Sequence, residues 1–268
     1  MSSKPLLITI PHSGERVPTE TPWLNELSEQ LLMFDVDRFV DRLYAPVIAE
    51  LGLPCVTTEW HRYAIDLNRL PDDVDCDSVL GHGNPSGKFA RGLHWVITTT
   101  GERLMPSPMP KAVHDILIAK YFTPFHRDVE VGLKKLRDQG AQETFHIDAH
   151  SMPSVGTKEH RDPGERRADV VVSDCSGKSC SPEFKELVIT SYQAAGFKVA
   201  YNWPYLGGRV TETYGHPERK QQAIQVEFNR ALYMNEQTKQ LMTDRVDGVQ
   251  RAIGGAIRQI HGALPEMS

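Results

Sequence analysis

Short apolar runs alternate along the chain with longer segments in which apolar residues recur every three or four positions. The short runs are rich in β-branched residues and predict buried strands, whereas the longer spacing predicts helices with one buried face. Because the two kinds of segment alternate, the pattern predicts an α/β protein with a largely parallel sheet and helices on both faces. The predicted strands are residues 6–10, 54–58, 144–147, 170–172, 198–201 and 224–228, and the predicted helices are residues 34–51, 111–137, 181–195 and 236–260.

The chain shows no linker, internal repeat or low-complexity tract. Residues 1–268 are therefore expected to form a single domain, with one long irregular region at residues 70–110 that holds many of the glycines and prolines. Gly52 marks the end of the first long helix. Pro124 lies inside the second helical pattern and predicts an interruption there.

Three predicted strands end in polar residues, within the stretches ITIPHSGE, FHIDAHS and IQVEFN. Because ligands bind beyond the carboxyl ends of strands in open α/β sheets, these side chains are expected to share one edge. His12 and His150 supply neutral imidazole nitrogens, and Asp148 is placed to orient the His150 ring. Two histidines and one carboxylate are the usual protein ligands of a catalytic zinc ion, with the fourth position left for water.

The carboxylate ligand has two candidates. Glu15 forms an HxxE turn with His12, whereas Asp35 and Asp37 lie at the entry of the following helix, near the same edge of the sheet. Asp35 is interpreted as the N-cap of that helix. Taken alone, a histidine at a strand end is more often a structural residue, and Glu15 beside Arg16 is typical of a solvated pair. The metal-site hypothesis therefore depends on the shared location of these groups.

Two arginine-containing stretches are candidates for binding a carboxylate. In HRYAIDLNR, Asn68 stands beside Arg69, and a guanidinium with a neighbouring amide suits bidentate recognition of a carboxylate. An ion pair between Asp66 and Arg69 that holds a turn is the alternative. In YNWPYLGGRV, Arg209 follows two glycines that permit the backbone to approach a ligand, and a plain glycine turn is the alternative.

Glu227, in the stretch QVEFN, is a candidate general base. Strand alternation places Gln225 and Glu227 on one face, away from Val226 and Phe228. A carboxylate beside a metal-bound water is the expected proton acceptor, and partial burial raises its pKa into a useful range. A solvent-facing strand glutamate is the alternative.

Composition excludes several classes of partner. The net charge is −5 and the isoelectric point is about 6.1, which does not favour binding to nucleic acid or to membranes. Apolar runs are far shorter than the ~20 residues of a membrane span, and the N-terminal residues do not have the profile of a signal peptide. No two cysteines form a CxxC pair, so reduced thiols in a cytoplasmic protein are expected; the cysteines are Cys55, Cys76, Cys175 and Cys180.

The stretches PHSG, DLNR, DAHSM and VEFNRALYM, in this order, resemble the N-formylglutamate amidohydrolase family. The segments FDVDRFVDRLY, PFHRDV and NWPYLGG are also similar to that family, and the resemblance covers residues 6–236. It implies a three-layer α/β/α fold of the zinc-exopeptidase (phosphorylase/hydrolase-like) type, with a central mixed, mostly parallel sheet. It also implies hydrolysis of N-formyl-L-glutamate to formate and L-glutamate, in histidine degradation.

The resemblance also implies roles for particular residues. His12 and His150 match zinc ligands, with one Zn²⁺ per chain expected and another divalent metal as the alternative. The resemblance favours Asp37 over Glu15 as the third ligand, because the family dependably has an aspartate at the position of Asp37. Glu227 matches the general base, which takes a proton from the attacking water.

The resemblance also implies how the substrate is bound, because Asn68 with Arg69 matches a carboxylate clamp. In the mechanism expected from these residues, Arg209 assists the clamp, and Arg62 or a neighbouring donor helps stabilise the oxyanion. Residues 70–110 match no family segment and are a candidate for substrate specificity. The stretch KEHRDPGERR, residues 158–167, is predicted to be a charged rim, with a lid as the alternative.

Two other functions remain open at this stage. The same metal site would also serve for cleaving another N-acyl amino acid or a terminal peptide bond, because fold and metal do not determine the acyl group. A non-catalytic ligand-binding module is less favoured, because every candidate ligand and the candidate base are present. The expected partner is a small-molecule N-acyl amino acid, and the sequence does not indicate an oligomeric state.

Overall fold

The computed structural model describes residues 4–75, 77–82 and 90–267. Within them a six-stranded sheet has the strand order β2–β1–β3–β6–β4–β5. All neighbouring strands of this sheet are parallel except β4 and β6, so the predicted mostly parallel sheet is confirmed. The strands are β1 (Leu6–Ile10), β2 (Cys55–Thr57), β3 (Thr144–Met152), β4 (Val170–Ser173), β5 (Val199–Tyr201) and β6 (Gln221–Asn229).

Strands β3 and β6 form the centre of the sheet and set His150 opposite Glu227. One face of the pair carries apolar residues such as Ile147 and Val226, which belong to the largest core cluster. β3 was predicted to end at residue 147 but continues to Met152. The alternation of polar and apolar residues runs on through Asp148, Ala149 and His150, and every residue of DAHSM is buried. His150 therefore lies within a strand and not in a loop after it.

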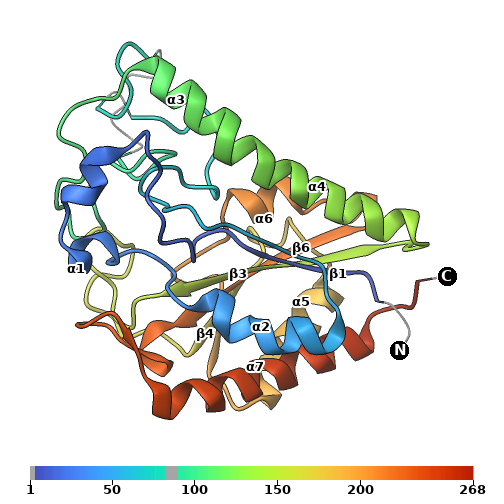
Figure 1. Ribbon diagram of the computed structural model, residues 1–268. Coiled ribbons are helices and arrows are strands. Elements are labelled where there is room, and N and C mark those ends of the chain that lie inside the picture. The colour runs from blue at the N-terminus through green and yellow to red at the C-terminus, as the bar shows by residue number, and fades with distance from the viewer. Residues whose placement is uncertain (1–3, 76, 83–89, 268) are drawn as a thin grey trace.

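Helices cover both faces of the sheet (Figure 1). On one face lie α2 (Val40–Leu51), α5 (Pro182–Ala194) and α7 (Thr243–Ala263), and α7 contacts the other two. On the opposite face α4 (Thr123–Asp138) contacts β1 and β2, and the short α6 (Arg209–Tyr214) contacts β6. This arrangement confirms the three-layer α/β/α fold that the resemblance implied.

The first long helix begins later than the apolar pattern predicted. α2 starts at Val40, and Phe39 before it has a left-handed backbone with φ of 71°. Asp35 is therefore not a helix N-cap; its carboxylate accepts hydrogen bonds from the hydroxyl and the backbone amide of Thr99. Residues 34–39 instead form a turn that brings Asp37 to the end of β1.

A π-helical turn interrupts the helical segment predicted at residues 111–137. α3 (Lys111–Leu117) passes through a π-helical turn, η2 (Ile118–Phe122), into α4, which has Pro124 in its first turn. Proline lacks the amide hydrogen and clashes with the carbonyl one turn earlier in a regular helix. A π turn relieves this conflict by inserting an extra residue. The predicted interruption therefore takes the form of a bulge in an otherwise continuous helical segment.

The last helix was predicted to begin at residue 236, but the chain after β6 first forms a short hairpin. β7 (Met234–Asn235) and β8 (Gln240–Leu241) form a small antiparallel hairpin, and α7 follows only at Thr243. No helix among the described residues is both long and apolar enough to span a bilayer. The remaining short helices are η1 (Pro22–Glu26), α1 (Glu29–Leu32), η3 (Pro217–Arg219) and η4 (Arg230–Leu232).

Three cysteines, Cys55, Cys175 and Cys180, carry free thiols. The fourth, Cys76, lies outside the described residues. The free thiols agree with the expected reduced state, and the cytoplasmic location inferred from cysteine usage stays a prediction.

Candidate metal centre and active site

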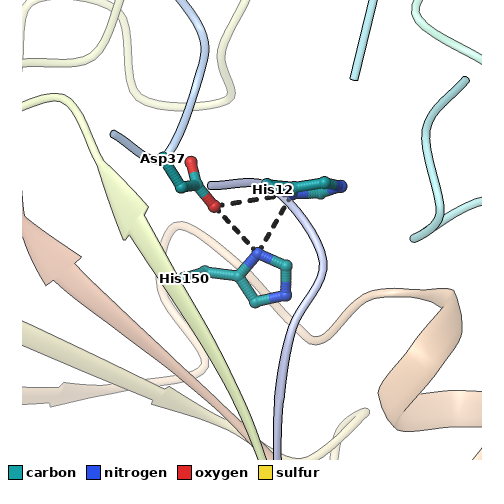
Figure 2. Close-up of side chains that lie close together, drawn as sticks. All are labelled: His12, Asp37 and His150. Atoms are coloured by element: carbon teal, nitrogen blue, oxygen red, sulfur yellow. Dashed lines mark hydrogen bonds and ion pairs between the residues drawn. The ribbon is translucent and has the colours of Figure 1, made fainter. Parts of the chain in front are cut away.

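His12, Asp37 and His150 bring three metal-ligating side chains together at the carboxyl edge of the sheet (Figure 2). His12 follows β1, His150 lies on β3, and Asp37 comes from the turn before α2. The amide of Asp37 donates to the carbonyl of His12 at 3.0 Å, which holds that turn against the end of β1. Each of the three residues is at most 2 % exposed, so water does not screen their charges.

The distances between the inward-facing atoms fit one metal ion. The two Nδ1 atoms of His12 and His150 are 3.1 Å apart. Asp37 Oδ2 lies 3.4 Å from His12 Nδ1 and 3.0 Å from His150 Nδ1. Zinc–nitrogen and zinc–oxygen bonds of about 2.0–2.1 Å in a tetrahedron separate neighbouring ligand atoms by about 3.3 Å.

Carboxylates behind the two rings determine their tautomers. Asp66 Oδ1 lies 2.7 Å from His12 Nε2, and Asp148 Oδ2 lies 3.0 Å from His150 Nε2. An ionised carboxylate only accepts hydrogen bonds, so each Nε2 carries a hydrogen, and in the neutral form of either ring the Nδ1 lone pair points inward. With both rings neutral, two lone pairs and the Asp37 carboxylate have no donor among them, so either a proton on a ring or a cation is needed to balance the group. The donor set therefore fits Zn²⁺ or a similar divalent metal.

The pKa values of the same groups indicate a local field that favours positive charge. Burial opposes ionisation of Asp37, but hydrogen bonds from His12 and His150 and the charge of Arg62 hold its pKa well below the ordinary value. Burial likewise opposes the charged form of His150, but Asp148 and Asp37 hold its pKa well above the ordinary value. A cation placed among these residues is therefore stabilised by its surroundings.

Asp66 joins the metal centre to the cavity wall. Its Oδ1 accepts from His12 and from the backbone amide of Asn68, at 2.7 and 2.9 Å. Its Oδ2 accepts from Arg62 and from the indole of Trp95, at 3.0 and 2.9 Å. With four donors the carboxylate is fully satisfied, although it is buried.

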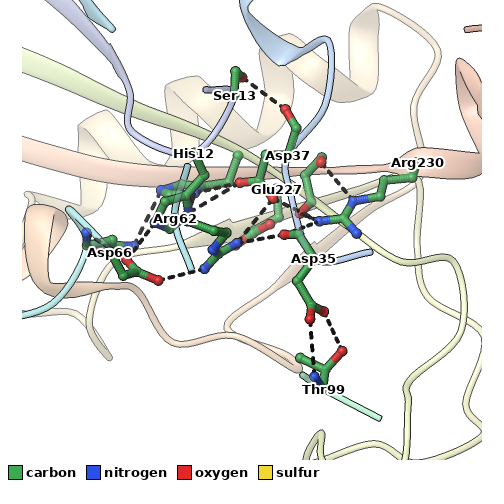
Figure 3. A network of polar contacts seen from close by, with 12 residues as sticks. His12, Ser13, Asp35, Asp37, Arg62, Asp66, Thr99, Glu227 and Arg230 are labelled. Atoms are coloured by element: carbon green, nitrogen blue, oxygen red, sulfur yellow. Dashed lines mark hydrogen bonds and ion pairs between the residues drawn. The ribbon is translucent and has the colours of Figure 1, made fainter. Parts of the chain in front are cut away.

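Arg62, the residue predicted to stabilise the oxyanion, lies beside the centre (Figure 3). Its Nη1 donates to the carbonyl of Asp35 at 3.0 Å and lies 3.5 Å from Asp37 Oδ1, while its Nη2 binds Asp66. The carboxylates of Asp66, Asp37 and Asp35 outweigh burial and raise the pKa of Arg62. The guanidinium is therefore a fixed positive charge next to the metal ligands.

Glu227 stands on β6 opposite His150 and is 7 % exposed. Gln225, on the same face as predicted, donates from Nε2 to Glu227 Oε1 at 2.9 Å. Burial raises the pKa of Glu227 to about 7; His150 opposes this rise and Asp37 adds to it. A carboxyl group with this pKa both accepts and returns a proton near neutral pH, which is what a general base of a hydrolase requires.

A cavity of about 290 Å³ opens onto these groups. The irregular segment 70–110 contributes Arg91, Trp95 and Thr99 to its wall, and the stretch predicted as a rim contributes residues 159–162. Among the described residues, five arginines and five acidic residues line the cavity, so an anionic ligand binds where an arginine is not paired with a buried carboxylate. These arginines are Arg62, Arg69, Arg91, Arg161 and Arg230.

Asn68 and Arg69 lie on the cavity wall, where the carboxylate clamp was predicted. Asn68 Oδ1 accepts from the amide of Val210 at 2.7 Å. Its side chain packs so closely on Gly208 that a Cβ there would lie 2.0 Å from Asn68 Nδ2, so only glycine fits. Among the described residues the guanidinium of Arg69 donates to the carbonyls of Asn68 and Arg91 and to no carboxylate. Its charge is therefore available to an anion in the cavity.

Arg209 does not line this cavity. Its Nε donates to Asp73 at 3.2 Å and its Nη1 to Glu212 at 2.6 Å, and these two ion pairs hold the side chain at a neighbouring surface. The substrate-binding role predicted for Arg209 therefore gains no support from its position.

Glu15, the alternative carboxylate ligand, is engaged elsewhere. Its two oxygens accept from Arg38 at 2.7 and 3.1 Å, and its side chain is 36 % exposed. Of the two candidates it is Asp37 that the structure brings to His12 and His150.

Sequence reasoning missed several residues of the site. Arg230 donates to Asp37 Oδ1 at 2.9 Å and is 4 % exposed. A signal for it was present, because it follows β6 directly in the VEFNR stretch. His160 and Tyr205, which also line the cavity, come from irregular segments without such a signal.

A buried His–Asp–His group and an adjacent buried glutamate, at the carboxyl edge of a mostly parallel sheet, are typical of metal-dependent hydrolases. Comparison with known proteins identifies the family within that class. A model of the N-formylglutamate amidohydrolase family matches residues 4–234, and the chain belongs to this family.

Two relatives bear the name N-formylglutamate deformylase. The protein from Pseudomonas aeruginosa is 30% identical over 238 residues, which cover 87% of this chain and 83% of the relative. The protein from Pseudomonas putida is 30% identical over 233 residues, covering 87% and 82%.

Solved structures support the fold. The crystal structure of an N-formylglutamate amidohydrolase from Ralstonia eutropha superposes with a TM-score of 0.87 at 23% identity, covering 98% of this chain and 95% of that one. A protein from Agrobacterium tumefaciens superposes with a TM-score of 0.69 at 17% identity, covering 97% and 90%.

Proposed function

We propose that this protein hydrolyses the amide bond of N-formyl-L-glutamate to give formate and L-glutamate. The observation that carries the proposal is the meeting of His12, Asp37 and His150 beside Glu227 in an arginine-lined cavity. Membership of the family and the name shared by the two Pseudomonas relatives point to the same substrate.

In this proposal His12, Asp37 and His150 would hold one Zn²⁺ ion, or another divalent metal that accepts the same ligands. A metal bound there would supply Lewis acidity and would make a water molecule easier to deprotonate near neutral pH. Asp66 and Asp148 keep the two imidazoles in the tautomer that metal binding requires.

Residues of the protein then transfer the proton and stabilise the negative charge that develops on the substrate. Glu227 accepts a proton from the attacking water at one carboxylate oxygen and returns it to the leaving amine nitrogen. Its pKa of about 7 suits both steps, because neither protonation state is strongly favoured near neutral pH. Arg62, fixed by Asp66, supplies positive charge where the formyl oxygen becomes negative.

Asn68 and Arg69 orient the substrate through the carboxylate next to the scissile amide. Arg69 is suited to this because its guanidinium meets only carbonyl groups among the described residues. A bidentate contact there fixes the amide relative to Glu227 and to the metal ligands.

The test combines a formate-release assay with elemental analysis of the purified protein. The expected results are one zinc, or equivalent divalent metal, per chain and faster turnover of N-formyl-L-glutamate than of N-acetyl-L-glutamate or dipeptides. Stoichiometric metal with turnover of an N-acetyl substrate or a dipeptide alone would replace the proposed substrate. Absence of turnover across the whole panel would reject the enzymatic proposal.

A further inference from the structure

The arginines that line the cavity differ in how their charges are balanced. Arg62 pairs with buried Asp66 at 3.0 Å, and Arg230 pairs with buried Asp37 at 2.9 Å. Arg69 and Arg161 donate only to carbonyl groups among the described residues, and the cavity wall also holds Arg91. Because Arg69 also contacts the backbone of Arg91, these two residues are the best placed to bind one substrate with two carboxylates, and Arg161 is the alternative for the second carboxylate.

Arg91 is occupied by a carboxylate of the protein itself. Its Nη1 lies 3.3 Å from Glu159 Oε2, and its Nη2 lies 3.3 Å from the carbonyl of Glu159. Both contacts are longer than the ~2.7–2.9 Å of a strong charge-assisted hydrogen bond, and only one carboxylate oxygen takes part. The two side chains are 28% and 36% exposed. An ion pair of this kind is weak and exchanges readily for a better-placed carboxylate.

The position of Arg91 is tied to that of Arg69. The Nε of Arg69 donates to the backbone carbonyl of Arg91 at 2.9 Å, so the two residues are held side by side on the wall. Burial, the charge of Arg62 and, less strongly, the charge of Arg91 lower the pKa of Arg69. The backbone contact and this charge interaction place both side chains at one part of the wall, as a ligand with two carboxylates on a short carbon chain requires.

The segment that carries Glu159 is anchored at its base. Arg167 binds Asp162 through two hydrogen bonds, at 2.7 and 2.8 Å, and both side chains are 1% exposed. Val155 also pairs with Arg166 across the base of the same loop. The Asp162–Arg167 pair does not involve Glu159, so separating Glu159 from Arg91 breaks neither hydrogen bond of this anchor.

We propose that Arg91 binds the distal carboxylate of the substrate, and that Glu159 occupies the same guanidinium until the substrate replaces it. This inference rests on the proposed function, in which Arg69 takes the carboxylate next to the amide. Glu159 then competes with the acidic side chain of the substrate for Arg91. Arg91 is the residue that distinguishes an acidic side chain from a neutral one.

The first test compares N-formyl-L-glutamate with N-formyl-L-glutamine, which differ in the charge of the distal group. In the metal-loaded enzyme, Arg91→Gln is expected to lower the preference in kcat/KM for the acid over the amide by about 30-fold, mainly through KM. Arg258→Gln is the matched control, because it breaks an exposed pair with Glu50 far from the cavity, and it keeps the preference. Equal losses on both substrates would overturn the proposal, as would a loss of preference in Arg161→Gln but not in Arg91→Gln.

The second test measures binding without turnover. Calorimetry with L-glutamate and L-glutamine on the metal-loaded protein is expected to show a Kd for L-glutamate about threefold lower in Glu159→Gln than in the wild type. An unchanged or higher Kd would reject the competition by Glu159. If the wild type does not hydrolyse N-formyl-L-glutamate, the proposed function fails by itself. The preference for L-glutamate over L-glutamine, and its loss in Arg91→Gln, still decides the role of Arg91.

Discussion

Replacing Glu227 by Gln removes the proton acceptor while keeping the size of the side chain. Gln225 lies 2.9 Å away and retains a hydrogen-bonding partner, and none of the three metal-ligating side chains is altered. General-base catalysis contributes about 10²–10⁴-fold, so kcat is expected to fall by at least 10²-fold, equivalent to about 3 kcal/mol in the barrier. Metal content, measured by elemental analysis, is expected to remain the same.

The same change is expected to stabilise the metal-free protein at alkaline pH. Folding raises the pKa of Glu227 from 4.5 to about 7, so the folded state holds its proton more tightly than the unfolded state. The stability that this group contributes is therefore complete below pH 4.5 and is lost as the pH rises through about 7. The difference corresponds to roughly 3 kcal/mol at about 1.36 kcal/mol for each pH unit. Glutamine does not ionise and avoids this loss.

The assay is urea unfolding of metal-stripped wild type and Glu227→Gln at pH 5 and pH 8, together with formate release by the metal-loaded proteins. The variant is expected to gain stability over the wild type on going from pH 5 to pH 8. Full activity in the variant would refute the assignment of the base. A stability difference that does not change with pH would refute the burial argument on which its pKa depends.

Three further predictions follow from the same geometry. The kcat/KM of the wild type is expected to fall about tenfold per pH unit below the pKa of Glu227, which is about 7 without metal and lower beside a bound cation, and a profile with no acid limb would contradict this. His150→Ala is expected to lose the metal in elemental analysis and to lose activity; retention of stoichiometric metal would show that the ion binds elsewhere. Gly208→Ala is expected to displace Asn68 and lower kcat/KM at least tenfold, whereas Gly248→Ala, at an unobstructed position in α7, keeps activity in the same assay.

The sequence was most informative where position in a strand determines position in space. His150 and Glu227 were placed near one another because the carboxyl ends of parallel strands share an edge, and their register bears this out. Alternation also predicted correctly that Gln225 and Glu227 share a face. Asp37 was singled out by family resemblance, because its approach depends on a turn at residues 34–39 that the helical apolar pattern concealed.

Residues outside regular elements were harder to place. Asp66 was considered as a partner of Arg69, but its side-chain partners are Arg62, four residues away, and His12 and Trp95, which lie far from it in the sequence. Arg209 follows two glycines as an anion-binding residue often does, yet its ion pairs hold it at another surface. Such contacts depend on how loops pack together, and a one-dimensional pattern contains no information on that packing.

The four hydrogen bonds received by Asp66 have a consequence for how this site can evolve. One carboxylate group orients the His12 imidazole, the Arg62 guanidinium, the Trp95 indole and the backbone of Asn68, which lie in or beside the proposed metal and substrate sites. A substitution at Asp66 thus disturbs several functions together, and no single second change restores them all. Mutations that change substrate preference are accordingly expected at the outer wall of the cavity, where a side chain can be replaced without breaking the hydrogen bonds of Asp66.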